Sequence, residues 1–181
     1  GEYVTVHRLD VPAMDAQDWY NSVVDGNSVF VAYAQLLART RHYDLIHIHD
    51  WLTGEAGITL KHLWKTPLIV TVHATERGRH QGWLPTNTSQ QIDHLEWRIA
   101  YEAWRVIACS NYMRDELVRC FALPQEKVTV IPNGIDTSQI HTCAESVLAA
   151  MRAQHAPHGE RLLFFVGRIV HEKGVHLIVR A

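Results

Sequence analysis

The sequence predicts an α/β protein built around a parallel β-sheet. Short apolar runs that are rich in β-branched residues have the composition of strands buried in a sheet. Five of them lie at Tyr3–His7, Leu45–His49, Leu68–Val72, Val106–Cys109 and Val128–Ile131. Stretches with apolar residues at helical spacing separate most of these runs, at Val29–Arg41, Thr53–Trp64, Ile92–Trp104 and Asn111–Phe121. Strands that alternate with helices form βαβ units, which predict parallel strands and helices on both faces of the sheet.

The composition is that of a soluble globular protein rather than a nucleic-acid-binding or membrane protein. The 181 residues are 47% hydrophobic and 20% charged, with a formal net charge of −2. There is no basic field to attract nucleic acid, and no apolar run approaches the ~18 residues of a membrane span. Three widely spaced cysteines without a CxxC pair favour a reducing compartment, so we expect a cytoplasmic protein.

Polar residues directly follow two of the predicted strands. Asp50 comes after Leu45–His49, and His73 comes after Leu68–Val72. Ligands of open α/β sheets bind outside the carboxyl ends of the strands. We therefore expect Asp50 and His73 to lie on one rim and to belong to the functional site. An imidazole there could donate to a hydroxyl or carbonyl, or could be an ordinary strand-end histidine.

His47 and His49 permit a second interpretation of the same rim. Alternate residues of a strand point to one face, so the two imidazoles lie on the same side and could hold a metal. The chain has 13 histidines, however, and no Glu-x-x-His motif or ordered carboxylate set accompanies this pair. Strand-end histidines bonded to backbone or water are the simpler interpretation, and we expect no metal.

The sequence also predicts one long loop and two helix caps. Residues 75–91 form a long polar stretch without periodicity, which predicts a functional or mobile loop. Its Arg77 and Arg79 could be solvated or could bind an anion by bidentate bonds. Ser110 and Thr53 each precede a predicted helix and are expected to cap its N-terminus.

A domain boundary is expected between residues 132 and 160. Residues 131–142 carry Pro, Asn-Gly and Asp, which are typical of turns and linkers, and a helix follows near Ala144–Gln154. The apolar run Leu162–Val166 then predicts a new strand.

The residues after this strand could bind a phosphate. Gly167 would let a ligand approach the backbone, and Arg168 and Lys173 flank the turn into a helix. A diphosphate needs several donors and compensating charge, which two cations beside a helix N-terminus supply. An ordinary strand–helix turn with solvated cations has the same pattern.

Five segments, taken together, resemble one family in their order and spacing. They are HIHDWLTGEAG, VTVHATERGR, ACSNYMRDEL, VIPNGID and FVGRIVHEKG, within residues 44–181. They resemble the glycosyltransferases of family 4 and the glycogen and starch synthases, which share the GT-B fold of two Rossmann-like domains facing a cleft. The resemblance implies part of the N-terminal domain at residues 1–132 and an interdomain linker and helix at 133–160. Residues 161–181 would then begin the C-terminal nucleotide-sugar-binding domain.

The resemblance implies a retaining glycosyltransferase. Such an enzyme would transfer a hexose, first of all glucose, from a nucleotide sugar such as UDP- or ADP-glucose to an acceptor hydroxyl, for instance of a glucan. His73 matches the catalytic histidine that contacts the transferred sugar, and Asp50 lies near the acceptor side. Gly167, Arg168 and Lys173 match the residues that bind the donor diphosphate. These cations stabilise the departing nucleotide, so the resemblance implies no metal and no cofactor.

The chain also departs from the family pattern. The Gly-rich loop after the family's first strand is absent, because Tyr3–Leu9 is interpreted as a later strand. The paired glutamates and the nucleotide-base pocket of the second domain are absent too. Gly1 in place of Met and the end of the chain soon after Leu162–Val166 indicate an internal fragment, which we expect to transfer no sugar. The orphan strand is expected to pair with a second copy of the chain.

Three other functional classes stay open on sequence alone. They are a nucleotide-binding Rossmann module without chemistry, a histidine-based metal hydrolase and a non-catalytic partner subunit of a larger assembly. Turnover of a nucleotide sugar would exclude the first, and elemental analysis would decide the second.

Overall fold

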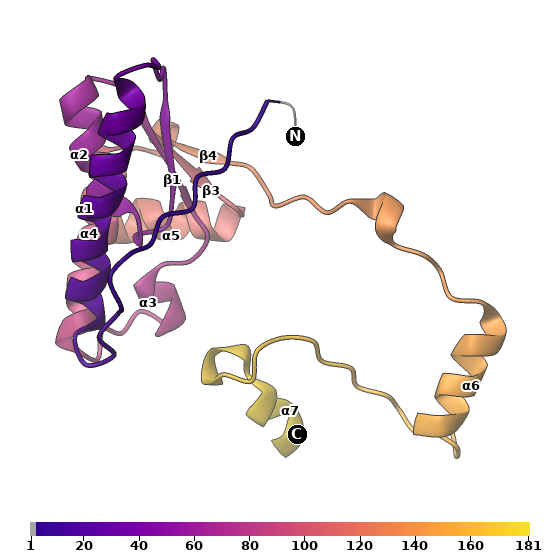
Figure 1. The fold of residues 1–181 in the computed structure, drawn as a ribbon. Helices are drawn as coiled ribbons and strands as arrows, with labels where there is room; N and C mark the ends of the chain where they lie inside the picture. Colours follow the sequence, from indigo (N-terminus) through magenta and orange to yellow (C-terminus); the bar gives the residue numbers. More distant parts are fainter. Residues whose placement is uncertain (1–2) are drawn as a thin grey trace. The chain divides into compact units, whose positions relative to one another are not determined.

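A computed structural model describes residues 3–181 and shows two compact units, Gly1–Asn133 and Gly134–Ala181 (Figure 1). Unit 1 contains the sheet. Its strands are β1 Ile46–His49, β2 Leu68–Val72, β3 Arg105–Ala108 and β4 Val128–Val130. Its helices are α1 Trp19–Ala38, α2 Gly54–Trp64, α3 Glu76–Arg79, α4 Asn87–Glu102, α5 Asn111–Phe121 and the short 3-10 helix η1 Gln125–Lys127.

The sheet has four strands in the order β1-β2-β3-β4, and every neighbouring pair is parallel. The register places Ile48 opposite Val70, Val70 opposite Val106, and Val106 opposite Val128. The α/β class and the parallel sheet are therefore confirmed, and four of the five apolar runs are strands close to their predicted bounds.

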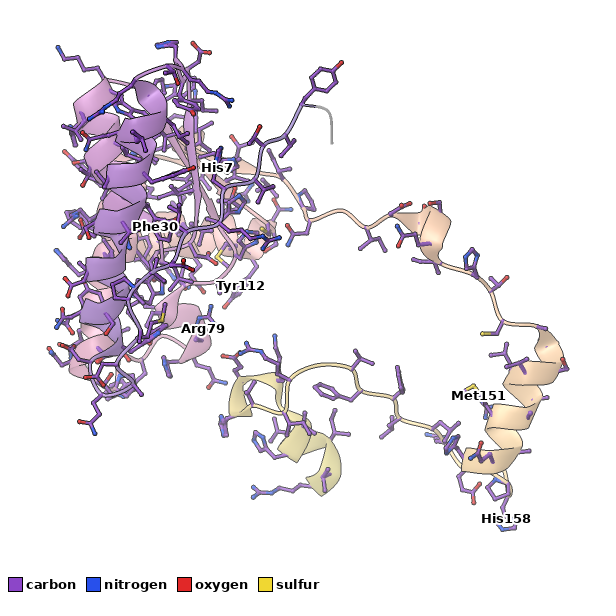
Figure 2. All side chains as sticks on the ribbon, viewed as in Figure 1. His7, Phe30, Arg79, Tyr112, Met151 and His158 are labelled. Atoms are coloured by element: carbon purple, nitrogen blue, oxygen red, sulfur yellow. The ribbon has the colours of Figure 1, made fainter. Side chains whose placement is uncertain are left out.

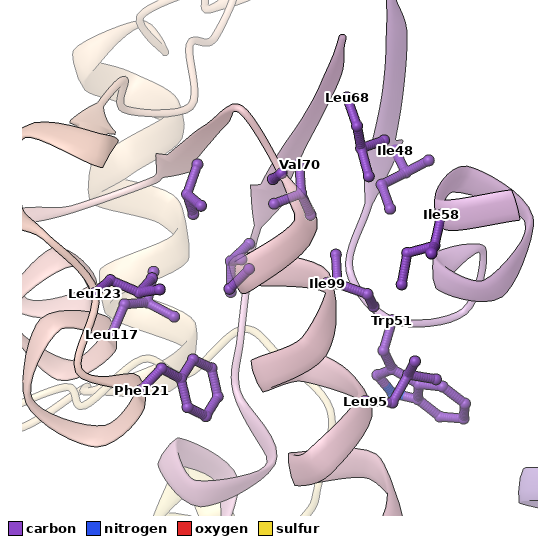
Figure 3. Close-up of a cluster of buried hydrophobic side chains, with 14 of the residues drawn as sticks. Ile48, Trp51, Ile58, Leu68, Val70, Leu95, Ile99, Leu117, Phe121 and Leu123 are labelled. Carbon is purple, nitrogen blue, oxygen red and sulfur yellow. The ribbon is translucent and has the colours of Figure 1, made fainter. Parts of the chain in front are cut away.

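One face of this sheet carries the buried core of unit 1. Alternate strand residues such as Ile48, Leu68 and Val106 are buried there together with side chains of α2, α4 and α5. Figure 3 shows Ile58 of α2, Ile99 of α4 and Leu117 of α5 gathered around these strands. Connections between parallel strands are right-handed, and a strand order that advances in one direction keeps the connecting helices on one face.

The opposite face of the sheet is less covered in unit 1 than predicted, since the sequence predicted helices on both faces. His47 and His49 are exposed, Ile69 and Ile107 are half-buried, and Thr71 is buried. Sequence periodicity does not tell a strand covered on both faces from one covered on a single face when the second face is only partly apolar. The open face is where the paired histidines of β1 lie.

The N-terminal part of the chain differs from the prediction. Tyr3–His7 forms no strand, and Tyr3 is 94% exposed. Nδ1 of His7, which Figure 2 labels, lies 2.9 Å from the Tyr33 hydroxyl. Tyr3, Thr5 and His7 line a groove with Ile46 of the edge strand β1, but the segment makes no ladder with that strand, so its β-branched residues stay unpaired. Helix α1 begins at Trp19 instead of Val29. The sequence prediction missed its first turns because polar residues there interrupt the helical spacing of the apolar residues.

The polar stretch 75–91 contains more helix than expected. Helix α3 begins after Thr75, whose hydroxyl accepts from the Gly78 N–H at 2.9 Å. Helix α4 begins within the same stretch, and the Thr86 hydroxyl accepts from the Ser89 N–H at 3.0 Å. The stretch predicted as one long irregular loop thus contains the starts of two helices, each capped by a threonine.

The two expected helix caps behave differently. Ser110 caps α5 as predicted, since its hydroxyl accepts from the Met113 N–H at 3.1 Å. Thr53 makes no side-chain cap bond to α2. Asn27 of α1 replaces it: its Oδ1 accepts from the Ala56 N–H at 2.9 Å, and its Nδ2 donates to the Leu52 carbonyl at 2.9 Å. Asn27 is 3% exposed, so a buried amide on α1 fixes the turn between β1 and α2.

Unit 2 contains η2 Thr137–Gln139, α6 Glu145–His155, η3 His171–Lys173 and α7 Val175–Arg180. The expected strand Leu162–Val166 is not a strand, and Phe164 is 91% exposed. A strand needs a neighbour to satisfy its backbone groups, and the described part of unit 2 supplies none. Leu162–Phe164 and α6 instead line an apolar groove of about 830 Å³. Pairing of this segment with a second copy stays a prediction.

Within residues 3–181, no helix combines the length and apolar character that crossing a bilayer requires.

Replacing Asn27 with alanine is expected to lower the free energy of unfolding by about 1–3 kcal/mol, because the buried Ala56 N–H and the part-buried Leu52 carbonyl lose their partner. Urea denaturation followed by circular dichroism measures this loss. Asn21→Ala is the matched control: Asn21 is an exposed residue of the same helix that bonds to Asp18, and its loss is expected to stay within about 0.5 kcal/mol. Equal losses in the two variants would contradict the capping role of Asn27.

Candidate functional site

The carboxyl ends of β1, β2 and β3 form the rim on which the candidate site lies. Asp50 follows β1, His73 follows β2 and Cys109 follows β3. Parallel strands bring these three positions to the same edge of the sheet. The rim position expected for Asp50 and His73 is confirmed, whereas sequence reasoning missed Cys109. Its signal was the same as that of the other two, a functional side chain directly after a strand.

Asp50 ties the ends of the first two strands together. Its N–H donates to the Thr71 carbonyl at 2.9 Å, and its Oδ1 accepts from the His73 N–H at 2.7 Å. Asp50 also has a φ of 55°, a left-handed conformation that is uncommon for residues other than glycine and concentrates at functional sites. This residue turns the chain away from the sheet and fixes the backbone of His73.

The ring of His73 has a partner at both nitrogens. Its Nε2 lies 2.9 Å from Nδ1 of His49, and its Nδ1 lies 3.4 Å from Sγ of Cys109. The rings of His49 and His73 are nearly parallel, with 12° between their planes. His73 is exposed, so this arrangement presents an ordered imidazole at the rim.

His47 and His49 lie on the same face of β1, as strand alternation predicted. Their ring centroids are 4.6 Å apart, and Nε2 of His47 lies 2.8 Å from the Thr71 hydroxyl. Burial lowers the pKa of His47, and the neighbouring His49 lowers it further. Among residues 3–181, no three or more His, Cys, Asp and Glu side chains come together in a way that could hold a metal.

The segment after His73 is anchored by buried carboxylates of α4. Arg77 makes two bonds to the Asp93 carboxylate, at 2.7 and 2.8 Å. The Glu76 N–H donates to the Glu96 carboxyl at 2.9 Å. Arg77 is thus bound internally instead of facing an anionic ligand, whereas Arg79 is exposed (Figure 2). The Thr75 hydroxyl adds a bond to the buried Glu116 of α5.

Glu96 has an unusual electrostatic environment. Burial raises its pKa to about 8, and the nearby Glu76 and Asp93 also raise it, against a backbone hydrogen bond from Glu76 and the charge of Arg79. Glu96 and Asp50 also line one small pocket, together with Trp51 of the core. Burial and the two neighbouring carboxylates thus favour the protonated form of Glu96, next to Asp50 of the rim.

The residues expected to bind a diphosphate belong to unit 2. Gly167, Arg168 and Lys173 are all exposed. Nη2 of Arg168 lies 3.1 Å from Oε1 of Glu172, and Lys173 ends η3. Asp50 and His73 belong to unit 1.

Comparison with known proteins identifies the family. The family profile described as Glycosyltransferase Family 4 matches residues 18–139, which include the rim residues Asp50, His73 and Cys109. The chain belongs to glycosyltransferase family 4. The resemblance inferred from the five sequence segments is therefore confirmed.

Several curated relatives have sequences similar to this chain. An uncharacterized glycosyltransferase of Methanocaldococcus jannaschii is 36% identical over 141 residues, 77% of this chain and 36% of the relative. A glycogen synthase of Mycobacterium tuberculosis is 38% identical over 138 residues, 76% of this chain and 31% of the relative. A D-inositol 3-phosphate glycosyltransferase of Kineococcus radiotolerans is 31% identical over 154 residues, 82% of this chain and 34% of the relative. The chain thus spans about a third of the length of these relatives.

A solved structure supports the GT-B assignment of the fold. Sucrose-phosphate synthase from Thermosynechococcus elongatus matches with a TM-score of 0.69 at 22% sequence identity. The match covers 93% of this chain and 40% of the synthase. The four parallel strands and their helices thus have the Rossmann-like architecture of a GT-B fold.

Replacing Glu96 with glutamine is expected to change how the stability of residues 1–181 depends on pH. The Glu96 pKa is about 8 in the folded state against an ordinary 4.5, so the folded state binds more protons and stability falls as pH rises between these values. Glu96→Gln removes this fall, so its free energy of unfolding relative to the parent should rise by up to ~1.4 kcal/mol per pH unit in that interval. Urea denaturation at several pH values measures the difference.

Glu126→Gln, a change at an exposed glutamate of η1, is the control for this experiment. Its difference from the parent should stay constant with pH. If the Glu96→Gln difference is equally constant, Glu96 does not retain its proton in the folded protein.

Proposed function

We propose that this chain is part of a retaining hexosyltransferase. The reaction moves a hexose, glucose by preference, from a nucleotide sugar to an acceptor hydroxyl such as that of a glucan. The observation on which the proposal rests is the placement of His73. This residue follows β2, its backbone is fixed by Asp50, and its ring is ordered and exposed at the rim. The glycogen synthase among the relatives, 38% identical, supports the choice of donor sugar and acceptor.

The role proposed for His73 is to orient the transferred sugar. An imidazole held at a strand end presents a polar edge at a fixed position, and it can stabilise positive charge that develops at the anomeric carbon. Asp50 acts on the acceptor side of the same rim. One of its carboxylate oxygens already accepts from the His73 N–H, and the other oxygen can accept from a sugar hydroxyl.

The proposed binding site for the donor diphosphate uses Gly167, Arg168 and Lys173. Two cations supply the charge that a departing nucleoside diphosphate needs, so the proposed reaction requires no metal. Arg168 now bonds to Glu172 and is 69% exposed at the side chain, so a diphosphate can compete for it at small cost. UDP-glucose and ADP-glucose are the donors to test first.

The proposal also places the protein in the cytoplasm. All three cysteines, Cys109, Cys120 and Cys143, are free thiols. Free thiols are typical of a reducing compartment.

Replacing His73 with alanine in the enzyme that contains this chain is expected to lower kcat far more than it weakens donor binding. The reason is that His73 acts on charge that develops in the transition state, and loss of one such group costs roughly 10²–10³ in rate. Steady-state kinetics with UDP- or ADP-glucose and a glucan, together with a donor-binding titration, separate the two effects. His94→Ala, at an exposed histidine of α4, is the control and should leave both constants unchanged. Loss of donor affinity with an unchanged kcat would make His73 an ordinary binding residue.

Residues 1–181 alone are expected to transfer no sugar. The chain spans about a third of the relatives, and no Gly-rich loop or paired glutamates of the family pattern occur in its sequence. Incubation with each donor and a glucan, followed by assay of released nucleoside diphosphate, measures turnover. Release that depends on acceptor and stops with His73→Ala would show that residues 1–181 suffice.

A further inference from the structure

The contacts of the His73 ring set the direction of its hydrogen bonds. The rings of His49 and His73 meet edge to edge, since their nitrogens are 2.9 Å apart while their centroids are 5.2 Å apart and their planes differ by only 12°. This is the geometry of an in-plane N–H···N hydrogen bond. One of the two nitrogens carries the proton, and the surroundings of Cys109 decide which one.

The Cys109 thiol lies among groups that accept. Its Sγ is 3.7 Å from the Val72 carbonyl and 3.7 Å from Oδ1 of Asn133. Both oxygens can only accept, so with the thiol proton directed to either of them the sulfur is free to accept from His73. Nδ1 of His73, 3.4 Å from this sulfur, then carries a proton.

The protonation of Nδ1 of His73 determines the role of its Nε2. A neutral imidazole has one protonated nitrogen, so Nε2 of His73 is the acceptor and Nδ1 of His49 is the donor. The chain of bonds thus runs from His49 through His73 and Cys109 to a carbonyl. His73 and Cys109 each accept from the member before and donate to the member after, which fixes both the tautomer and the plane of the His73 ring.

We propose that His49 and Cys109 are positioning residues that hold His73 as the Nδ1–H tautomer. The consequence for catalysis rests on the proposed function of His73. An imidazole held at both nitrogens and at its backbone N–H does not have to reorganise when the sugar arrives. His49 thereby acts on the reaction through His73 without touching the substrate.

Nitrogen-15 NMR of the imidazoles in residues 1–181 tests the tautomer without any assay of activity. We expect His73 to be protonated at Nδ1 in the parent and to become a mixture of tautomers in His49→Ala and in Cys109→Ala. His49→Asn should restore the parent spectrum, because the asparagine amide N–H can replace the Nδ1–H donor. His47→Ala is the matched control: it removes a ring of the same open face whose own bond goes to Thr71, and it should keep the parent tautomer. Protonation at Nε2 in the parent, or an unchanged tautomer in both alanine variants, would overturn the inference.

Kinetics on the enzyme that contains this chain test the catalytic consequence. His49→Ala is expected to lower kcat by roughly 10- to 100-fold, the usual effect of losing a supporting partner, with little change in donor KM. His49→Asn should recover most of the loss. If His73→Ala leaves kcat unchanged, the proposed function fails while the tautomer result stands. If His73→Ala lowers kcat but His49→Ala changes neither tautomer nor kcat, the positioning role fails and the proposed function stands.

Discussion

Asp50 is the residue on which the geometry of the rim depends. It joins β1 to β2 through its own N–H and through its carboxylate, and it adopts a left-handed conformation to do so. The turn that it makes leads directly to Trp51, which is buried in the core, and to the start of α2. The buried amide of Asn27 in α1 also makes hydrogen bonds to this turn, at Leu52 and Ala56. The position of His73 is therefore set by a strand end, a core aromatic residue and a buried amide together.

Buried acidic groups stabilise the segment that follows His73. Charged groups that leave water need partners or must become neutral, and both solutions occur here. Asp93 has Arg77 as a bidentate partner, while Glu96 accepts a backbone N–H and has its pKa raised to about 8. These bonds attach α3 to α4, so the chain leaves the rim along a defined path. A site residue at the end of β2 gains order from this anchoring, because the backbone is fixed on both sides of it.

The two units differ in how far their sequences satisfy their own hydrogen-bonding and packing needs. In unit 1, strands pair in register over a buried core that includes Leu68 and Val106, neither of which is exposed. In unit 2, Leu162–Val166 has the composition of a strand, yet Phe164 and Val166 are 91% and 79% exposed. An apolar run is not sufficient to form a strand in a parallel sheet, because the ladder needs a neighbour.

The sequence by itself determined the α/β class, four strand positions, the Ser110 cap and the rim position of Asp50 and His73, because these depend on local periodicity and on the rule that parallel strands end together. Only the tertiary structure decided what depends on distant partners. It denied Tyr3–His7 a ladder, replaced Thr53 by Asn27 as the cap of α2, and gave Arg77 to Asp93 instead of a ligand. It also brought His49, His73 and Cys109 into one hydrogen-bonded chain, although they lie on three different strands or strand ends. The physical reason is common to all of these: a hydrogen bond between residues far apart in sequence requires both to be placed by the packed sheet, and no local pattern encodes that placement.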